Sequence, residues 1–145
     1  MSRGAASTTD RKAQAVHDRS VEQAPVPVLI VDDQASFRRA ASVVVDATDG
    51  YVLAGQAESG EAALEMLARV PVGLVVMDVH MPGMGGVQAA EEMRRCHPTV
   101  RVLLTSIYSR PDELPSVVAT SAAVFCRKEL FGPDVLDRVW RSRPA

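Results

Sequence analysis

Short apolar runs alternate along this chain with stretches in which apolar residues recur every three or four positions. Runs of strand type are found at 26–31, 51–57, 74–78, 100–104 and 123–127. Helical spacing predicts intervening helices at 34–48, 59–71, 86–97 and 115–121, and a last helix that starts at Gly132-Pro133-Asp134. Strands that alternate with helices indicate an α/β fold, in which a five-stranded parallel sheet carries helices on both faces.

The helical segments show which side chains should be buried. The 34–48 helix carries an apolar stripe made of Phe37, Ala40, Ala41, Val44 and Val45. Pro71 is expected to end the 59–71 helix, because proline cannot continue a helical hydrogen-bond ladder. Proline is favoured in a helix's first turn, as in the last helix, whose expected buried side chains are Val135, Leu136, Val139 and Trp140.

The chain divides into a polar N-terminal segment and one domain. Residues 1–24 are rich in Ser, Thr, Ala, Gln and charge, and we expect a disordered tail there. The remaining residues, 25–145, are enough to form a single domain with a real core.

Composition excludes several classes of function. Lys and Arg total 16 against 18 Asp and Glu, a net charge of -2, which argues against a nucleic-acid-coating surface. No apolar run approaches the roughly 18 residues of a membrane span, and the N-terminus lacks a signal-peptide core. The two cysteines, Cys96 and Cys126, have no metal-ligand spacing, so we expect reduced thiols in a cytoplasmic protein.

The predicted strands end in polar residues. Asp32 and Asp33 follow the first strand, Asp78 ends the third, Thr105 follows the fourth and Lys128 follows the fifth. The carboxyl ends of parallel strands meet at one edge, where open α/β sheets bind their ligands. We therefore expect three carboxylates, one hydroxyl and one ammonium group to lie together. Lys128 is also one of only two lysines, so its position is unusual for an arginine-rich chain.

Each of these residues also has an ordinary structural interpretation. The Asp32-Asp33 pair could be an N-cap for the helix that follows. Thr105 could be a simple strand-end hydroxyl, and Lys128 a solvated surface lysine. Their joint occurrence favours a functional site.

The complete set resembles the response-regulator receiver domain of bacterial two-component signalling. The matching residues are Val31-Asp32-Asp33, the segment from Asp78 to Gly86, Leu104-Thr105-Ser106, and Phe125-Cys126-Arg127-Lys128. The resemblance covers residues 26–141 and implies a flavodoxin-like, doubly wound sheet of strand order 2-1-3-4-5. The chain is similar to the receivers of LuxR-type regulators, but it stops at Ala145 without a helix-turn-helix, so we expect a stand-alone receiver with no DNA-binding domain and no membrane attachment.

The resemblance implies a role for each strand-end residue. Asp78 would accept a phosphoryl group from a sensor histidine kinase or a phosphotransfer protein. Mg²⁺ would be bound by Asp33, Asp78, the backbone carbonyl of His80 and, through water, Asp32. Lys128 and Thr105 would bind the phosphoryl oxygens. The protein would then be no enzyme beyond its own phosphorylation and dephosphorylation.

The resemblance also implies which residues change conformation after phosphorylation. In the family, Thr105 moves toward the phosphoryl group and the aromatic residue at Phe125 turns inward, which changes a face where members dimerise or meet partners. A homodimer is thus one expected assembly, and the downstream partner stays unidentified. Phe125 could equally be plain core. This chain has Val124 and Glu129 where the family often has glycine and proline.

His80 lies two positions after Asp78, where side chains in the family influence the lifetime of the phosphoryl group. We expect its imidazole to tune hydrolysis of phospho-Asp78, the alternative being a solvent-facing side chain.

Two other functions stay open: a receiver-like interaction module that acts without phosphorylation, and a small hydrolase with an aspartate nucleophile. A dinucleotide-binding domain is disfavoured, because the first strand leads into Asp32-Asp33 and not into a glycine-rich turn.

Overall fold

Five parallel strands form the centre of the domain, in the order β2-β1-β3-β4-β5. The computed structural model describes residues 24–107 and 124–141. The strands are β1 (Val26–Val31), β2 (Tyr51–Ala57), β3 (Leu74–Asp78), β4 (Arg101–Ser106) and β5 (Val124–Arg127). This is the α/β flavodoxin-like arrangement that the sequence predicts, with the expected strand order.

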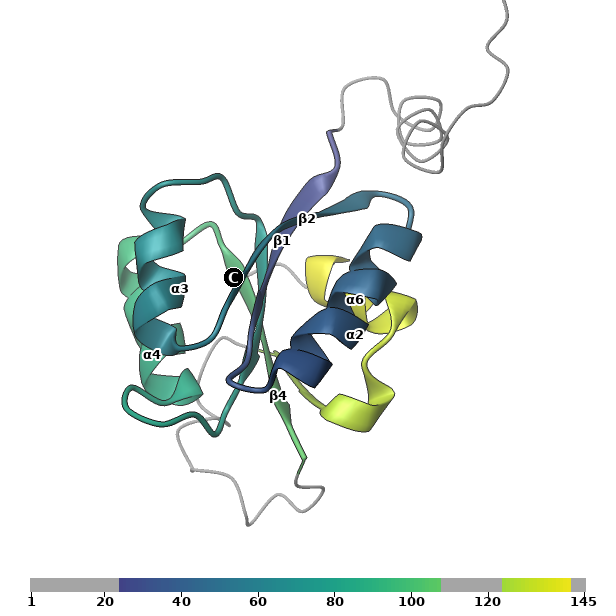
Figure 1. Ribbon diagram of the computed structural model, residues 1–145. Coiled ribbons are helices and arrows are strands. Elements are labelled where there is room, and N and C mark those ends of the chain that lie inside the picture. Colours follow the sequence, from purple (N-terminus) through teal and green to yellow (C-terminus); the bar gives the residue numbers. More distant parts are fainter. Residues whose placement is uncertain (1–23, 108–123, 142–145) are drawn as a thin grey trace, which may run out of the picture.

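Helices cover both faces of the sheet (Figure 1). The helices are α2 (Ala35–Ala47), α3 (Gly60–Leu67), α4 (Gly86–Cys96) and α6 (Pro133–Arg141), and a short 3-10 turn, η2 (Lys128–Leu130), follows β5. The predicted disordered tail at 1–24, apart from its last residue, and the predicted helix at 115–121 lie outside the described residues.

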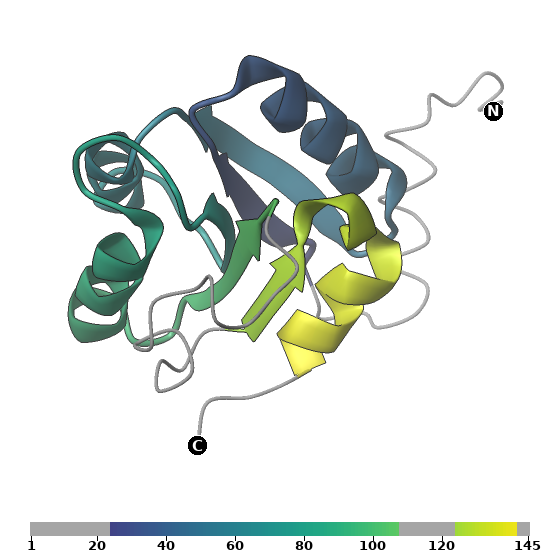
Figure 2. The same ribbon diagram turned by 90° about the horizontal axis from the view of Figure 1, so that it is seen from below.

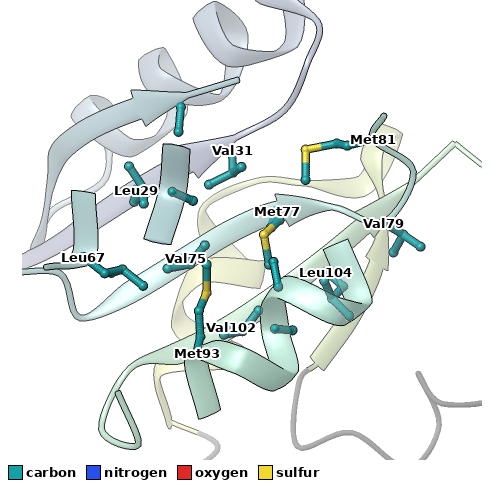
Figure 3. Packing of buried hydrophobic residues seen from close by; sticks show 14 residues of the cluster. Leu29, Val31, Leu67, Val75, Met77, Val79, Met81, Met93, Val102 and Leu104 are labelled. Carbon is teal, nitrogen blue, oxygen red and sulfur yellow. The ribbon is translucent and has the colours of Figure 1, made fainter. Parts of the chain in front are cut away.

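The core consists of two apolar layers, one on each side of the sheet. One layer packs α3 and α4 against side chains such as Val75, Met77 and Leu104 (Figure 3). The other packs α2 and α6 against Ile30, Val76 and their neighbours. All five residues of β3 are buried, as expected for the central strand of a doubly covered sheet. This strand carries Asp78 and is therefore held rigidly.

The structure corrects three details of the sequence prediction, one helix end and the burial of two side chains. Helix α3 ends at Leu67, four residues before Pro71, and the chain continues in a tighter turn in which the Arg69 N–H donates to the Met66 carbonyl oxygen three residues back. Ala40 is exposed, whereas its neighbour Ala41 is buried, so the buried face of α2 is narrower than the predicted stripe. Trp140 is half-buried, with its ring stacked under the Arg101 guanidinium at 4.0 Å.

The N-terminus of α2 excludes the capping interpretation of the acidic pair. The N-cap residue is Gln34, and it makes no side-chain cap hydrogen bond. Asp32 instead accepts a hydrogen bond from the Gln34 backbone N–H through Oδ1, at 2.9 Å, which turns the chain between β1 and α2. The acidic pair is thus left at the sheet edge, and its remaining oxygens are available to other groups.

Candidate functional site

Three carboxylates meet at the carboxyl ends of β1 and β3, the edge that faces the viewer in Figure 2. One oxygen from each of Asp32, Asp33 and Asp78 lies within 4.8 Å of the other two. Asp32 is completely buried, Asp78 is nearly so, and Asp33 is exposed. Three hard oxygen donors in such a cluster form a chemically suitable site for a divalent cation.

Lys128 is the cation that balances this cluster in the structure. Its Nζ lies 2.7 Å from Asp32 Oδ2 and 3.4 Å from Asp78 Oδ2, and only 11% of its side chain is exposed. The interpretation of Lys128 as a solvated surface lysine is therefore wrong. An ammonium that touches two buried carboxylates offsets much of their mutual repulsion.

Thr105 completes the group from the neighbouring strand. It pairs with Asp78 in the β3–β4 register, and its backbone carbonyl accepts a 2.8 Å hydrogen bond from Val79 N–H. The Thr105 side chain is fully buried, yet its Oγ1 has no hydrogen-bond partner among the described residues. A buried hydroxyl without a partner is costly, and such a group is often reserved for a ligand.

The pKa of Asp78 is raised above its ordinary value of 3.8, chiefly because burial disfavours the charged form. The nearby Asp32 charge raises it further, whereas the His80 backbone N–H, 3.2 Å from Oδ1, and Lys128 lower it. Without a metal ion, the ionised carboxylate is therefore held in a net unfavourable environment. A positive charge placed at the cluster would relieve this strain.

Gly86 fixes the loop that runs from Asp78 back into α4. A Cβ at this position would collide with the Asp78 carbonyl oxygen, whereas a Cβ at Gly85 would meet only Val79 O at 3.6 Å, an ordinary contact. The Gly86 backbone N–H also donates to Val79 O, at 3.0 Å. The close approach of two backbone segments thus requires glycine at Gly86 but not at Gly85.

Gly86→Ala should therefore lower the free energy of unfolding by about 2–3 kcal/mol, because the added methyl group overpacks a rigid backbone contact. Gly85→Ala is the matched control and should change it by less than about 1 kcal/mol. Chemical denaturation of the two variants measures the difference. Equal stability of both would contradict the tight approach at Gly86.

The structure places the remaining predicted site residues at the periphery. The His80 side chain is exposed, and its backbone follows Asp78 by two positions. Phe125 is half-buried on β5 and packs against the apolar layer of α3 and α4. Its expected switch movement and its plain core role are both compatible with this position, so the switch role stays a prediction.

Two residues of α2 contact the site although the sequence suggested only packing for one and no role for the other. The Phe37 ring lies 4.9 Å from Lys128 Nζ, measured to the ring centroid. The Arg38 guanidinium donates a 2.7 Å hydrogen bond to the Asp32 carbonyl oxygen. The sequence feature that could have indicated these contacts is the position of both residues in the first turn of the helix after the acidic pair.

A family model described as the response regulator receiver domain matches residues 28–139, the stretch that holds every strand-end residue described above. The chain belongs to this family. Similar proteins agree: 82 residues are 37% identical to the response regulator GacA of Pseudomonas syringae pv. syringae, covering 57% of this chain and 38% of that protein. The transcriptional regulatory protein DegU of Brevibacillus brevis is 25% identical over 122 residues, or 84% of this chain and 52% of DegU.

Solved structures show the same receiver fold. The receiver domain of the response regulator NarL from Mycobacterium tuberculosis superposes with a TM-score of 0.74 at 27% identity, covering 82% of this chain and 98% of that domain. The response regulator domain of Thermotoga maritima CheB has a TM-score of 0.70 at 21% identity, covering 83% and 100% of the two chains, and shows the fold alone.

This receiver matches only part of each curated relative, because the aligned residues span 38% of GacA and 52% of DegU. Within residues 24–107 and 124–141, the receiver fold is the whole structure, and no DNA-binding unit is seen. No helix in this part of the receiver is long and apolar enough to cross a membrane. The expectation of a stand-alone protein stays a prediction.

Proposed function

We propose that this receiver takes a phosphoryl group onto Asp78 from a sensor histidine kinase or a phosphotransfer protein, with Mg²⁺ as cofactor, and that the modified domain binds a downstream partner differently. The observation that carries the proposal is the arrangement around Asp78. A buried carboxylate at the end of β3 lies beside an acidic cluster, an ammonium and a buried hydroxyl without a partner.

The donor set suits Mg²⁺, which prefers carboxylate and carbonyl oxygens and keeps several waters. Asp33 and Asp78 would bind it through their carboxylates, His80 through its backbone carbonyl and Asp32 through water. When bound, the ion supplies positive charge that offsets the repulsion between these carboxylates and an incoming phosphoryl group.

The chain's own residues perform the transfer. A carboxylate oxygen of Asp78 attacks phosphorus, the new P–O bond forms as the donor's P–N bond breaks, and the donor imidazole leaves as a neutral ring after taking up one proton from solvent. Lys128 exchanges its contact with Asp78 for the phosphoryl oxygens, and Thr105 Oγ1 donates a hydrogen bond to the same group. The reaction is stoichiometric, so the protein is a phosphoacceptor that also loses its own phosphoryl group, and not an enzyme with turnover on other substrates.

The added charge of about -1.5 to -2 would bias the switch residues Thr105 and Phe125. Thr105 and Phe125 lie on the adjacent strands β4 and β5, where Phe125 pairs with Leu104, the residue before Thr105. The expected output is a changed affinity for a protein partner or for a second copy. We place the receiver in the cytoplasm, which agrees with its two free cysteines.

Phosphotransfer profiling tests the proposal. The histidine kinases encoded with this protein are autophosphorylated with labelled ATP and mixed with the wild type or with Asp78→Asn. Rapid label transfer from one kinase to the wild type alone supports the proposal. Binding of a partner that is equally tight for the wild type and Asp78→Asn, with no label transfer from any kinase, would instead support an interaction module that acts without phosphorylation.

His80→Ala should change the autodephosphorylation rate of the phosphorylated receiver by about threefold or more, since the His80 backbone contacts the acceptor carboxylate and its exposed side chain can reach the phosphoryl group or its attacking water. The decay of labelled phosphoprotein measures this rate. His97→Ala, at the far end of α4, is the control and should decay as the wild type does. An unchanged rate in His80→Ala would leave His80 with its backbone role only.

A further inference from the structure

The Lys128 ammonium is enclosed by groups from three different elements. Asp32 after β1 and Asp78 on β3 supply carboxylates at 2.7 and 3.4 Å, and Phe37 on α2 supplies an aromatic ring at 4.9 Å. A cation within about 6 Å of a ring centroid is attracted by the negative face of the ring. Only 11% of the lysine side chain remains exposed, and the ring is one of the groups that surround the ammonium.

A second aromatic ring lies beside Phe37. The Phe131 ring lies 6.2 Å from it at an interplanar angle of 56°, a tilted arrangement that aromatic pairs favour. The 3-10 turn Lys128–Leu130 brings Phe131 into place, and the Phe131 N–H donates to the Lys128 carbonyl oxygen at 3.2 Å. The same turn therefore presents both the lysine and the second aromatic ring.

We propose that Phe37 is a positioning residue for Lys128, which keeps the ammonium between Asp32 and Asp78 and so within reach of a phosphoryl group on Asp78. This rests on the proposed function. A lysine side chain is long and flexible, and its charge is strongly hydrated. With the ring removed, the ammonium gains a path to solvent and samples the productive position less often. The Phe131 side chain contacts the Phe37 ring, and its contact with Lys128 is a backbone hydrogen bond that a Phe131→Leu substitution would keep.

A spectroscopic test of the contact needs no phosphate. The chain contains two lysines, so ¹³C-lysine labelling gives two sets of ε-methylene signals, and Lys12→Arg removes one of them. The Lys128 ε-protons should be shifted upfield by the ring current in the wild type and in Phe37→Tyr, but not in Phe37→Leu. Phe131→Leu should keep most of the shift. Identical Lys128 signals in the wild type and Phe37→Leu would overturn the proposal.

A kinetic test measures the consequence. With acetyl phosphate and saturating Mg²⁺, Phe37→Leu should slow phosphorylation about fivefold, within the range of one lost cation–π contact, and leave the Mg²⁺ affinity within about twofold of the wild type. Phe37→Tyr should restore the rate. Phe131→Leu removes a comparable aromatic side chain and should stay within about twofold of the wild-type rate.

The outcomes separate this inference from the proposed function. Equal slowing in Phe37→Leu and Phe131→Leu would show a merely structural role and would overturn the positioning role. A wild type that takes up no phosphoryl group would contradict the proposed function, and the lysine spectra would then decide the Phe37 contact alone.

Discussion

Lys128→Met should lower the free energy of unfolding of the metal-free receiver by about 3 kcal/mol, because it leaves a completely buried Asp32 carboxylate without its cation. The same change removes the group that competes for the acidic cluster. Mg²⁺ should therefore bind more tightly and restore much of the lost stability, whereas phosphorylation of Asp78 should slow strongly. Urea unfolding with and without Mg²⁺ measures the first two effects.

Arg127→Met is the matched control for this variant. Arg127 precedes Lys128 in the chain and makes an ion pair with Glu129 at 3.3 Å, but the Arg127 and Glu129 side chains are 37% and 65% exposed, far more than Lys128. Its loss should change stability by less than about 1 kcal/mol, as is usual for surface ion pairs. Similar losses in both variants would mean that burial of the Lys128 pair contributes little.

Asp78→Asn should make the metal-free receiver more stable than the wild type at pH 7, by about 1 kcal/mol or more, the cost of one close pair of like charges. Burial, together with the Asp32 charge, raises the folded-state pKa of Asp78 above its ordinary value. A carboxyl group with a raised pKa contributes its stability below the unfolded-state pKa and loses it as the pH rises through the folded-state pKa. The advantage of Asp78→Asn should thus be full at neutral pH and shrink as the pH falls toward 3.8.

Denaturation midpoints measured between about pH 3.5 and 8 test this dependence. Asp49→Asn, in an exposed turn, should follow the wild type to within about 0.5 kcal/mol. Mg²⁺ should reverse the order at pH 7, since it stabilises the wild type more. A less stable Asp78→Asn at neutral pH without metal would show that the Lys128 contact outweighs burial.

Much of the fold could be predicted because local pattern and packing agree. The 74–78 run is apolar up to Asp78, and the structure buries all five residues in the central strand. Parallel strands then bring Asp32, Asp33, Asp78, Thr105 and Lys128 to one edge whatever the lengths of the intervening helices, and the structure brings them together. The sheet topology explains why these five residues lie together, and it does not by itself assign their chemical roles.

The contacts that depend on side-chain reach could not be predicted in the same way. The spacing of Phe37 predicts only its packing in the apolar stripe, whereas in the structure the ring both packs against the α2 and α6 layer and lies beside Lys128. Glu61 accepts a hydrogen bond from Met84 N–H at 3.3 Å, although 23 residues separate the two and no periodicity links them. Ala40 matches the helical spacing yet is exposed, whereas Ala41 is buried, because a periodic pattern does not report how wide a face of the helix the sheet covers.

Intact-mass measurement after incubation with acetyl phosphate and Mg²⁺ tests most directly whether Asp78 is a phosphoacceptor. The account predicts one adduct of about 80 Da, a single phosphoryl group, on the wild type and none on Asp78→Asn. The adduct should disappear when Mg²⁺ is chelated before the reaction. No adduct on the wild type, or an equal adduct on Asp78→Asn, would contradict the account.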